Sequence, residues 1–143
     1  MYIVTGGAGF IGSQLVAALS ASSEGQVIVC DKFGTDDRWK NIARSEVAEI
    51  ISPELLPNFL SVRGHEVDAI LHMGAISATT ERNVDAIIEQ NISCTRWLWD
   101  WCSRNEVRFI YASSAATYGD GEQGFRDDDS LEYLSQLEPL NAY

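Results

Sequence analysis

Short apolar runs alternate with longer amphipathic segments along this chain, and the alternation predicts its fold. Apolar, β-branched runs are typical of buried parallel strands, whereas apolar positions recurring about every 3.6 residues indicate helices. Strands are expected at residues 2–5, 26–31, 46–51, 67–72 and 107–112. Helices are expected from 11 to about 21, from 53 to about 60 and from 84 to 104. The sequence therefore predicts an α/β protein with a doubly wound parallel sheet of strand order 3-2-1-4-5.

The turn after the first strand is rich in glycine and reads Thr5-Gly6-Gly7-Ala8-Gly9-Phe10-Ile11-Gly12. Gly6 would permit a tight turn, Gly9 would let a diphosphate approach the backbone, and Gly12 would let the next helix pack closely on the sheet. The N-terminus of that helix offers N–H groups and a positive dipole end to phosphate. Asp31 ends the second strand about 20 residues on, where it would bind a ribose hydroxyl. These features predict a Rossmann-type dinucleotide site; a tight turn without a ligand is the alternative.

Charged residues after the second strand leave the choice of nucleotide open. Asp31 favours an unmodified ribose hydroxyl and hence NAD. Lys32 and Arg38 would instead neutralise a ribose phosphate and favour NADP. For Arg38, an ordinary solvated charge explains the sequence equally well.

Further candidates follow the fourth and fifth strands. His72 ends the fourth strand, where a hydrogen-bonded core residue is favoured over a catalytic base. Gly74 would let the backbone approach a ligand, and Ser113 and Ser114 would either serve as donors or cap a turn. Because ligands bind where the strand order reverses, outside the carboxyl ends of the first and fourth strands, these segments are expected to converge there.

The long helix expected at 84–104 carries two unusual features. Asn91 interrupts its apolar stripe, and a buried Asn must be hydrogen-bonded. It either braces a neighbouring loop or is a tolerated polar residue. Trp97, Trp99 and Trp101 predict an exposed apolar patch, either a subunit contact or a surface packed by a further part of the chain.

Composition excludes several classes of function. The net charge is −11, from 10 basic and 21 acidic residues, which argues against a nucleic-acid surface. No apolar run reaches the ~20 residues that span a bilayer, and residues 1–30 lack a basic leader, so no membrane partner is expected. Cys30, Cys94 and Cys102 have no metal-site spacing and are expected to be buried thiols of a cytoplasmic protein.

Four stretches together resemble the extended short-chain dehydrogenase/reductases. They are residues 5–12, 72–75, 113–119 and 139–143. Within that superfamily, residues 74–81, the Tyr111-Ala112 pair before the serines, and Pro139-Leu140-Asn141 are most similar to the ADP-L-glycero-D-manno-heptose 6-epimerases. The resemblance covers the whole chain but only the first half of such an enzyme.

The resemblance implies an NADP-dependent nucleotide-sugar epimerase, acting at the sixth carbon of ADP-heptose in lipopolysaccharide core synthesis. Ser114 would hydrogen-bond the reacting oxygen, and Tyr143, which opens a YxxxK motif, would be the acid/base. The implied cofactor contacts are Phe10, Ile11, Asp31, Lys32, Arg38, Met73, Gly74, Ala75, Ile76, Ser77 and Asn91. A phenol with a pKa near ~10 needs nearby positive charge to act as a base at neutral pH, and a serine hydroxyl can stabilise a developing alkoxide.

The same resemblance implies that residues 1–143 are an incomplete NAD(P)-binding domain, truncated before its last strands and lacking the substrate domain. The lysine of YxxxK would lie beyond Tyr143, so the chain alone is expected to bind cofactor poorly and be inactive, whereas the full-length protein would be a homo-oligomer. Pro53 stands where relatives can carry a lysine near the ribose phosphate, which leaves NAD open.

Two other functions stay open: another NAD-dependent nucleotide-sugar epimerase or reductase, such as a UDP-glucose 4-epimerase, and a non-catalytic NAD(P) sensor. A dehydratase is disfavoured because Ala115 and Ala116 occupy the place of the Asp-Glu pair in that branch.

Overall fold

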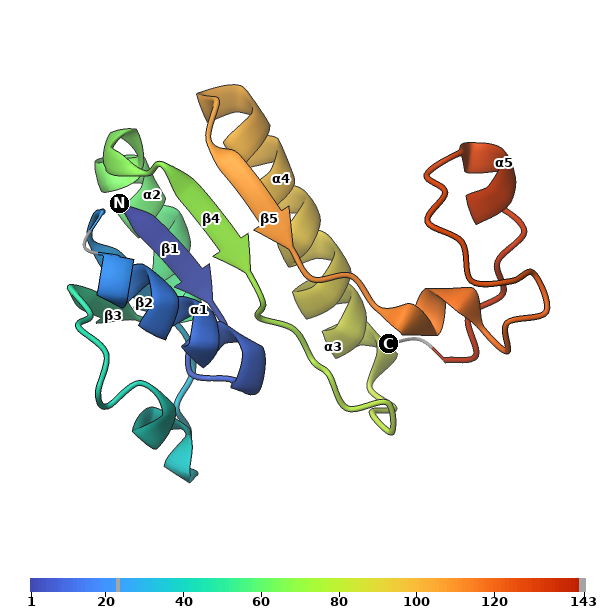
Figure 1. Cartoon of the computed structure of the whole chain (residues 1–143), viewed down its shortest axis with the longest axis horizontal. Coiled ribbons are helices and arrows are strands. Elements are labelled where there is room, and N and C mark those ends of the chain that lie inside the picture. The colour runs from blue at the N-terminus through green and yellow to red at the C-terminus, as the bar shows by residue number, and fades with distance from the viewer. Residues whose placement is uncertain (23, 142–143) are drawn as a thin grey trace.

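A parallel five-stranded sheet of order β3-β2-β1-β4-β5 forms the centre of the computed structural model, which describes residues 1–22 and 24–141 (Figure 1). Its strands are β1 Tyr2–Thr5, β2 Val27–Cys30, β3 Glu49–Ile51, β4 Ala69–His72 and β5 Arg108–Tyr111. Thr5 pairs in register with Cys30 on one side and His72 on the other. The predicted fold class and strand order are confirmed.

Helices connect the strands on both faces of the sheet (Figure 1). The α-helices are α1 Phe10–Ser22, α2 Leu56–Arg63, α3 Val84–Ile87, α4 Cys94–Asn105 and α5 Leu131–Leu134. Short 3₁₀ helices span Asp37–Asn41, Pro53–Leu55, Gly64–Glu66 and Ala115–Tyr118. No helix in the described part of the chain is both long and apolar enough to cross a bilayer.

The long helix expected at 84–104 has a π-helical segment, Ile88–Ser93, between α3 and α4. Its apolar stripe predicted a helix but not this wider turn. Asn91, which interrupts the stripe, lies within the segment. Such insertions within helices are frequent at functional sites.

The side chains of β1 and β2 alternate between two apolar cores, one on each face of the sheet. Val4, Val27 and Val29 pack with Val16 of α1, whereas Ile3, Ile28 and Ile70 pack beneath α2 and α4. Because both faces are covered, these strands read as unbroken apolar runs.

The apolar residues that recur at helical spacing in α1 do not form its buried face. Ile11 is 58% exposed and Ala18 is also exposed, while Leu15 and Leu19 are half-buried. Gly12, Ser13 and Val16 are the buried residues instead. The first turn of α1 packs against the glycine turn, where only small side chains fit.

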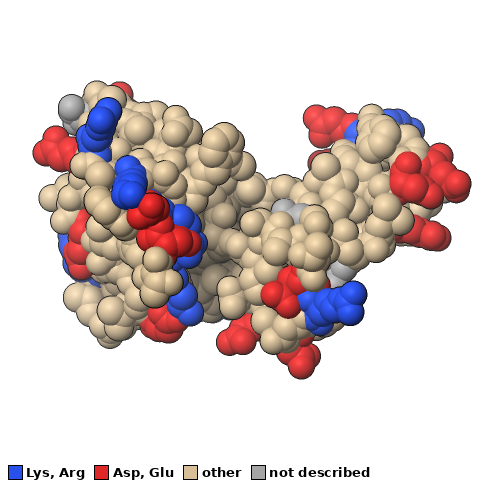
Figure 2. All heavy atoms as spheres, turned by 90° about the horizontal axis from the view of Figure 1, so that it is seen from below, with Lys and Arg blue, Asp and Glu red and all other residues tan. Residues whose placement is uncertain are grey.

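Residues 112–141 extend from the carboxyl end of β5 and project away from the sheet (Figure 1). This stretch contains α5, whose Tyr133 is buried and donates its hydroxyl to the Gly124 carbonyl at 2.8 Å. Acidic side chains gather on the surface of this part, whereas both signs of charge mix over the sheet domain (Figure 2).

Candidate functional site

The polar segments predicted to bind ligand all follow strands at one edge of the sheet. The ends of β1, β2 and β4 lie level because Thr5 pairs with both Cys30 and His72. β5 ends at the same edge, since His72 pairs with Tyr111. Figure 2 views the molecule from this side and shows a hollow near its middle.

The turn after β1 requires glycine because its backbone packs against neighbouring backbone, which leaves little room for a Cβ atom. Gly6 has a φ of +62°, and a Cβ there would lie 2.7–2.8 Å from backbone atoms of Met73 and Gly74. A Cβ on Gly12 would lie 2.1 Å from the carbonyl oxygen of Gly6. The close packing predicted for Gly12 is therefore against the turn itself. A Cβ on Gly9 would lie 3.1 Å from the Gly6 carbonyl oxygen, a tight contact, and would approach no other residue beyond its chain neighbours within 4 Å, so Gly9 is the least enclosed of the three.

Gly74 follows β4 and packs against the same turn. A Cβ on this residue would lie 3.1 Å from both the Gly6 nitrogen and the Thr5 Oγ1. The Gly74 amide donates to Thr5 Oγ1 at 3.1 Å. The two loops at the switch point of the sheet are therefore in direct backbone contact.

Asp31 fixes the glycine turn relative to β2. Its Oδ2 accepts from the Ala8 amide at 2.8 Å, its Oδ1 accepts from the Lys32 amide at 2.7 Å, and its side chain is 10% exposed. Asn41, which the sequence analysis missed, donates its Nδ2 to the Ala8 carbonyl at 2.8 Å. Its position in a polar loop 33 residues from Ala8 offered no signal.

Exposed ion pairs surround Asp31. Lys32 pairs with Glu54, and their hydrogen bond raises the pKa of Lys32 and lowers that of Glu54. Arg38 donates its Nε to Asp36 at 2.7 Å, and its Nη1 lies 4.0 Å from Asp31 Oδ1. Both predicted cofactor cations are thus beside the site, and each has an acidic partner of its own.

Two predicted cofactor residues open α1 with exposed apolar side chains. Phe10 is 89% exposed and Ile11 is 58% exposed. Both follow Gly9 directly, at the mouth of the turn. The first amides of an α-helix lack intrahelical partners, so this end can bind an anion.

A chain of buried hydrogen bonds crosses the site beneath the loops. His72 Nδ1 lies 2.6 Å from Thr5 Oγ1, and its Nε2 lies 2.9 Å from Thr95 Oγ1. Thr95 Oγ1 in turn donates to the Asn91 carbonyl at 2.6 Å. Burial lowers the pKa of His72 to about 4, so the imidazole is neutral near pH 7. His72 is the hydrogen-bonded core residue that the sequence favoured.

Asn91 braces the loop after β4, as one of its two predicted interpretations required. Its Oδ1 accepts from the Ile76 amide at 2.8 Å, and its Nδ2 donates to the Ile76 carbonyl at 3.0 Å. The braced loop contains all five cofactor positions predicted there, which are Met73, Gly74, Ala75, Ile76 and Ser77. Ala75 and Ser77 are exposed and the other three are half-buried.

The two predicted catalytic hydroxyls belong to Ser114 and Tyr143. Ser114 is the N-cap of a 3₁₀ helix, where its Oγ accepts from the Ala116 amide at 3.1 Å. The capping role considered for this serine is therefore present, and it leaves the hydroxyl proton available to another acceptor. Tyr143 lies outside the described residues.

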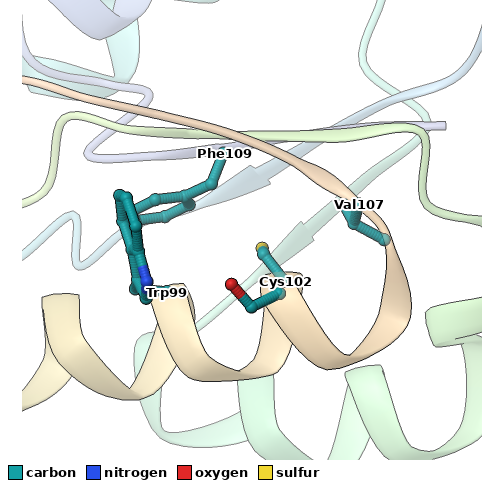
Figure 3. Close-up of a pocket in the computed structure, with 5 residues that line it drawn as sticks. Trp99, Cys102, Val107 and Phe109 are labelled. Atoms are coloured by element: carbon teal, nitrogen blue, oxygen red, sulfur yellow. The ribbon is translucent and has the colours of Figure 1, made fainter.

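A separate hollow lies between α4 and β5, and one of its lining residues, Phe109, stacks on His72 with ring centroids 5.9 Å apart (Figure 3). It is lined by Trp99, Cys102, Ser103, Val107 and Phe109. Val107 precedes β5, so the hollow opens toward the amino end of that strand, opposite the glycine turn. Burial raises the pKa of the Cys102 thiol to about 11, which keeps it protonated.

The predicted tryptophan patch is present in part. Trp97 and Trp99 are 36% and 53% exposed, whereas Trp101 packs on the core.

Comparison with known proteins agrees with this geometry. A family described as the NAD dependent epimerase/dehydratase family matches residues 2–143. The ADP-L-glycero-D-manno-heptose-6-epimerase of Fusobacterium nucleatum is 43% identical over 145 residues, covering all of this chain and 44% of that protein. The enzyme of the same name from Nitratidesulfovibrio vulgaris is 44% identical over 148 residues, again covering 44% of its length.

Solved structures show the same fold. The ADP-L-glycero-D-manno-heptose-6-epimerase of Helicobacter pylori aligns with a TM-score of 0.74 at 26% identity, over 99% of this chain and 46% of that one. UDP-glucuronic acid 4-epimerase from Bacillus cereus, in complex with NAD, aligns with a TM-score of 0.79 at 27% identity, over the same shares of the two chains. The chain thus spans less than half the length of these relatives, and the resemblance found in its motifs is confirmed. By sequence and by fold, this chain belongs to the NAD-dependent epimerase/dehydratase family.

Proposed function

We propose that this chain is the nicotinamide-nucleotide-binding part of a nucleotide-sugar epimerase. The observation that carries the proposal is the glycine turn, where Gly6 and Gly12 are enclosed by backbone on several sides but Gly9 meets only the Gly6 carbonyl oxygen. Gly9 is therefore the glycine of the turn with the least protein around it, which suits the approach of a diphosphate. Family membership and the nucleotide-sugar epimerases among its relatives support the same conclusion.

The residues present fit a dinucleotide. The amides at the start of α1 would bind the diphosphate, and Asp31 would accept from a ribose hydroxyl with lone pairs not used by Ala8 and Lys32. The loop Met73–Ser77, held by Asn91, would line the site beyond the turn. When bound, the nucleotide supplies a reversible hydride acceptor.

For the nucleotide we propose NADP, with NAD as the second candidate. Lys32 and Arg38 flank Asp31 and would neutralise a ribose phosphate. NAD is favoured by the acidic partners that these cations already have, Glu54 and Asp36. It is also the nucleotide named with the Bacillus cereus structure.

Removal of hydride from a sugar alcohol also requires its proton to leave. Ser114 would donate its hydroxyl proton to the developing alkoxide, and Tyr143 would accept and return the proton. The proposed substrate is ADP-glycero-manno-heptose with inversion at its sixth carbon, as the 43% and 44% identical relatives suggest. The second candidate is a UDP-hexose 4-epimerase, which the TM-score of 0.79 favours.

The binding proposal is tested with Gly9→Ala. The added Cβ would lie 3.1 Å from the Gly6 carbonyl oxygen, so we expect a small loss of thermal stability, well below that of Gly12→Ala. The same methyl group would occupy the approach of a diphosphate, so NADH and NADPH affinity, measured by fluorescence titration, should fall about tenfold or more. Equal affinity in both proteins would refute the site.

The substrate proposal is tested separately on the full-length protein that contains this chain. Incubation with ADP-heptose should invert the configuration at the sixth carbon of the sugar, and NMR of the sugar measures this inversion. Inversion of a UDP-hexose at the fourth carbon, with no change in ADP-heptose, would assign the second candidate instead.

A further inference from the structure

Buried hydrogen bonds run through His72 from Thr5, which precedes the glycine turn, to Thr95 in α4. We propose that His72 is a positioning residue that couples the two walls of the nucleotide site, the glycine turn and the loop Met73–Ser77. The inference rests on the proposed function for its consequence, nucleotide affinity. The coupling itself is a property of this chain and can be measured without a nucleotide.

One end of the hydrogen-bond chain lies where the two walls meet, and the other end holds the far part of the second wall. At one end, Thr5 directly precedes Gly6, and its Oγ1 both contacts His72 and accepts from the Gly74 amide. At the other end, Thr95 holds the carbonyl of Asn91, whose side chain makes two hydrogen bonds to Ile76. His72 is the residue that contacts both threonines.

The donor and the acceptor of each hydrogen bond around His72 follow from its neighbours. Thr5 Oγ1 accepts from the Gly74 amide, and its own proton is donated to Nδ1 of His72, which is the unprotonated nitrogen of a neutral imidazole that donates from Nε2. His72 must then donate its Nε2 proton to Thr95 Oγ1, because the Thr95 proton is donated to the Asn91 carbonyl. A single tautomer satisfies all these bonds, whereas a protonated imidazole would donate to Thr5 Oγ1 and leave the Thr5 proton without its acceptor. The low pKa of His72 agrees with this neutral form.

The π-helical segment holds the end of the hydrogen-bond chain that lies farther from the glycine turn. Within Ile88–Ser93 the backbone departs from the regular α-helical ladder, and the Cys94 amide donates to the Glu89 carbonyl. The Thr95 hydroxyl donates to the Asn91 carbonyl inside this segment. The wider turn and the bond to Thr95 together hold Asn91, and through it Ile76, at one distance from His72.

Burial of Thr5 and His72 raises the energetic cost of losing a hydrogen bond between them. Thr5 and His72 are both buried, so loss of one partner leaves the other without compensation from water. A substitution of Thr95 should therefore change hydrogen exchange at the Gly74 amide, although no hydrogen bond joins the two residues. A purely local structural role would confine the change to the Asn91 end.

The test combines amide hydrogen exchange by NMR, without nucleotide, with NADH titration. Thr95→Val keeps the side-chain shape and removes the hydroxyl; we expect exchange at the Gly74 amide to rise roughly five- to tenfold and NADH affinity to fall by a similar factor. Ser61→Ala is the matched control, since Ser61 is also a helical hydroxyl bonded to a carbonyl one turn earlier, at 2.7 Å. It should change neither quantity.

Substitutions of His72 give a directional result. His72→Gln keeps a side-chain donor for Thr95 and should preserve protection at Ile76 better than at Gly74. His72→Asn keeps an acceptor near Thr5 and should do the reverse. Thr5→Ser retains the hydroxyl, so hydrogen exchange at the Gly74 and Ile76 amides should stay at its native rate.

The outcomes separate the two proposals. If Thr95→Val changes exchange at Ile76 but not at Gly74, the coupling is refuted whatever NADH does. If exchange is coupled but the native chain binds neither NADH nor NADPH, the coupling stands and the proposed function fails. If NADH binds and Thr95→Val leaves its affinity unchanged, the role of His72 in the site is refuted.

Discussion

The centre and the rim of the site lie at the same edge of the sheet but are built in opposite ways. The centre comprises Thr5, Gly6, Gly12, His72 and Asn91, which are buried or half-buried, uncharged near neutral pH and linked by hydrogen bonds and backbone contacts. The rim comprises Lys32, Asp36, Arg38 and Glu54, whose side chains are 43% to 63% exposed and joined in two ion pairs.

Burial explains what each region can contribute. An exposed ion pair is worth about 0–1 kcal/mol because water and salt screen it. A buried polar group left without a partner costs about 1–3 kcal/mol. The centre should therefore set the geometry of the site, while the rim adjusts which nucleotide is preferred.

The largest effect is expected from Gly12→Ala. Its Cβ would lie 2.1 Å from the Gly6 carbonyl oxygen, a backbone atom that cannot rotate away. We expect a loss of about 3 kcal/mol or more in the free energy of unfolding, measured by urea denaturation, together with loss of nucleotide binding. Gly25→Ala is the control, because its Cβ would meet only the Tyr2 ring and more distant atoms, from 3.3 Å outward. Similar stability of the two variants would show that the turn is not rigid.

A second effect is expected from pH. The pKa of His72 is about 4 in the folded chain, against an ordinary value of 6.5. Between these values the unfolded chain binds a proton that the folded chain does not, so stability is complete above about pH 6.5 and falls as the pH is lowered toward 4. The expected loss is about 3 kcal/mol.

Urea denaturation between pH 4 and 7 measures this loss, and His72→Asn serves as the control. Carboxylates of the rim titrate in both proteins, so the difference between their pH profiles isolates the imidazole. Parallel profiles would contradict a buried neutral His72.

The smallest effect is expected from Arg38→Ala at the rim. Arg38 is 43% exposed and already paired with Asp36, so we expect NADPH affinity to fall only about three- to tenfold, with NADH affinity nearly unchanged. The effect should shrink at high salt. Lys40→Ala is the matched control, since Lys40 is an exposed cation of the same loop paired with Asp37 at 2.8 Å. Equal losses for both nucleotides would remove Arg38 from nucleotide selection.

Much of the fold and part of the site could be predicted because the signals are local. The apolar runs gave the strand order through the handedness of their connections, and the spacing of Gly6, Gly9, Gly12 and Asp31 indicated the turn and its acidic partner. Asn91 was recognisable as a polar break in an apolar stripe. By contrast, the apolar spacing of α1 does not indicate its buried face, because the contact that selects Gly12 and Ser13 comes from the turn rather than from helical periodicity.

The links between residues far apart in sequence could not be predicted. Thr5 and His72 are 67 residues apart, and Asn41 is 33 residues from the carbonyl it binds. Thr95 lies four residues after Asn91, a helical spacing that offered a weak signal. Nothing in the pattern indicated that Glu54 would neutralise Lys32.

The amino-acid sequence by itself determined the order of the strands, the glycine turn and the acid after β2, because these depend on residues close together along the chain. Only the tertiary structure decided that His72 is neutral, which carbonyl Asn41 binds and how the rim cations are paired. Those properties depend on burial and on partners brought together by the parallel sheet, and free energies of burial and pairing arise only once the chain is folded.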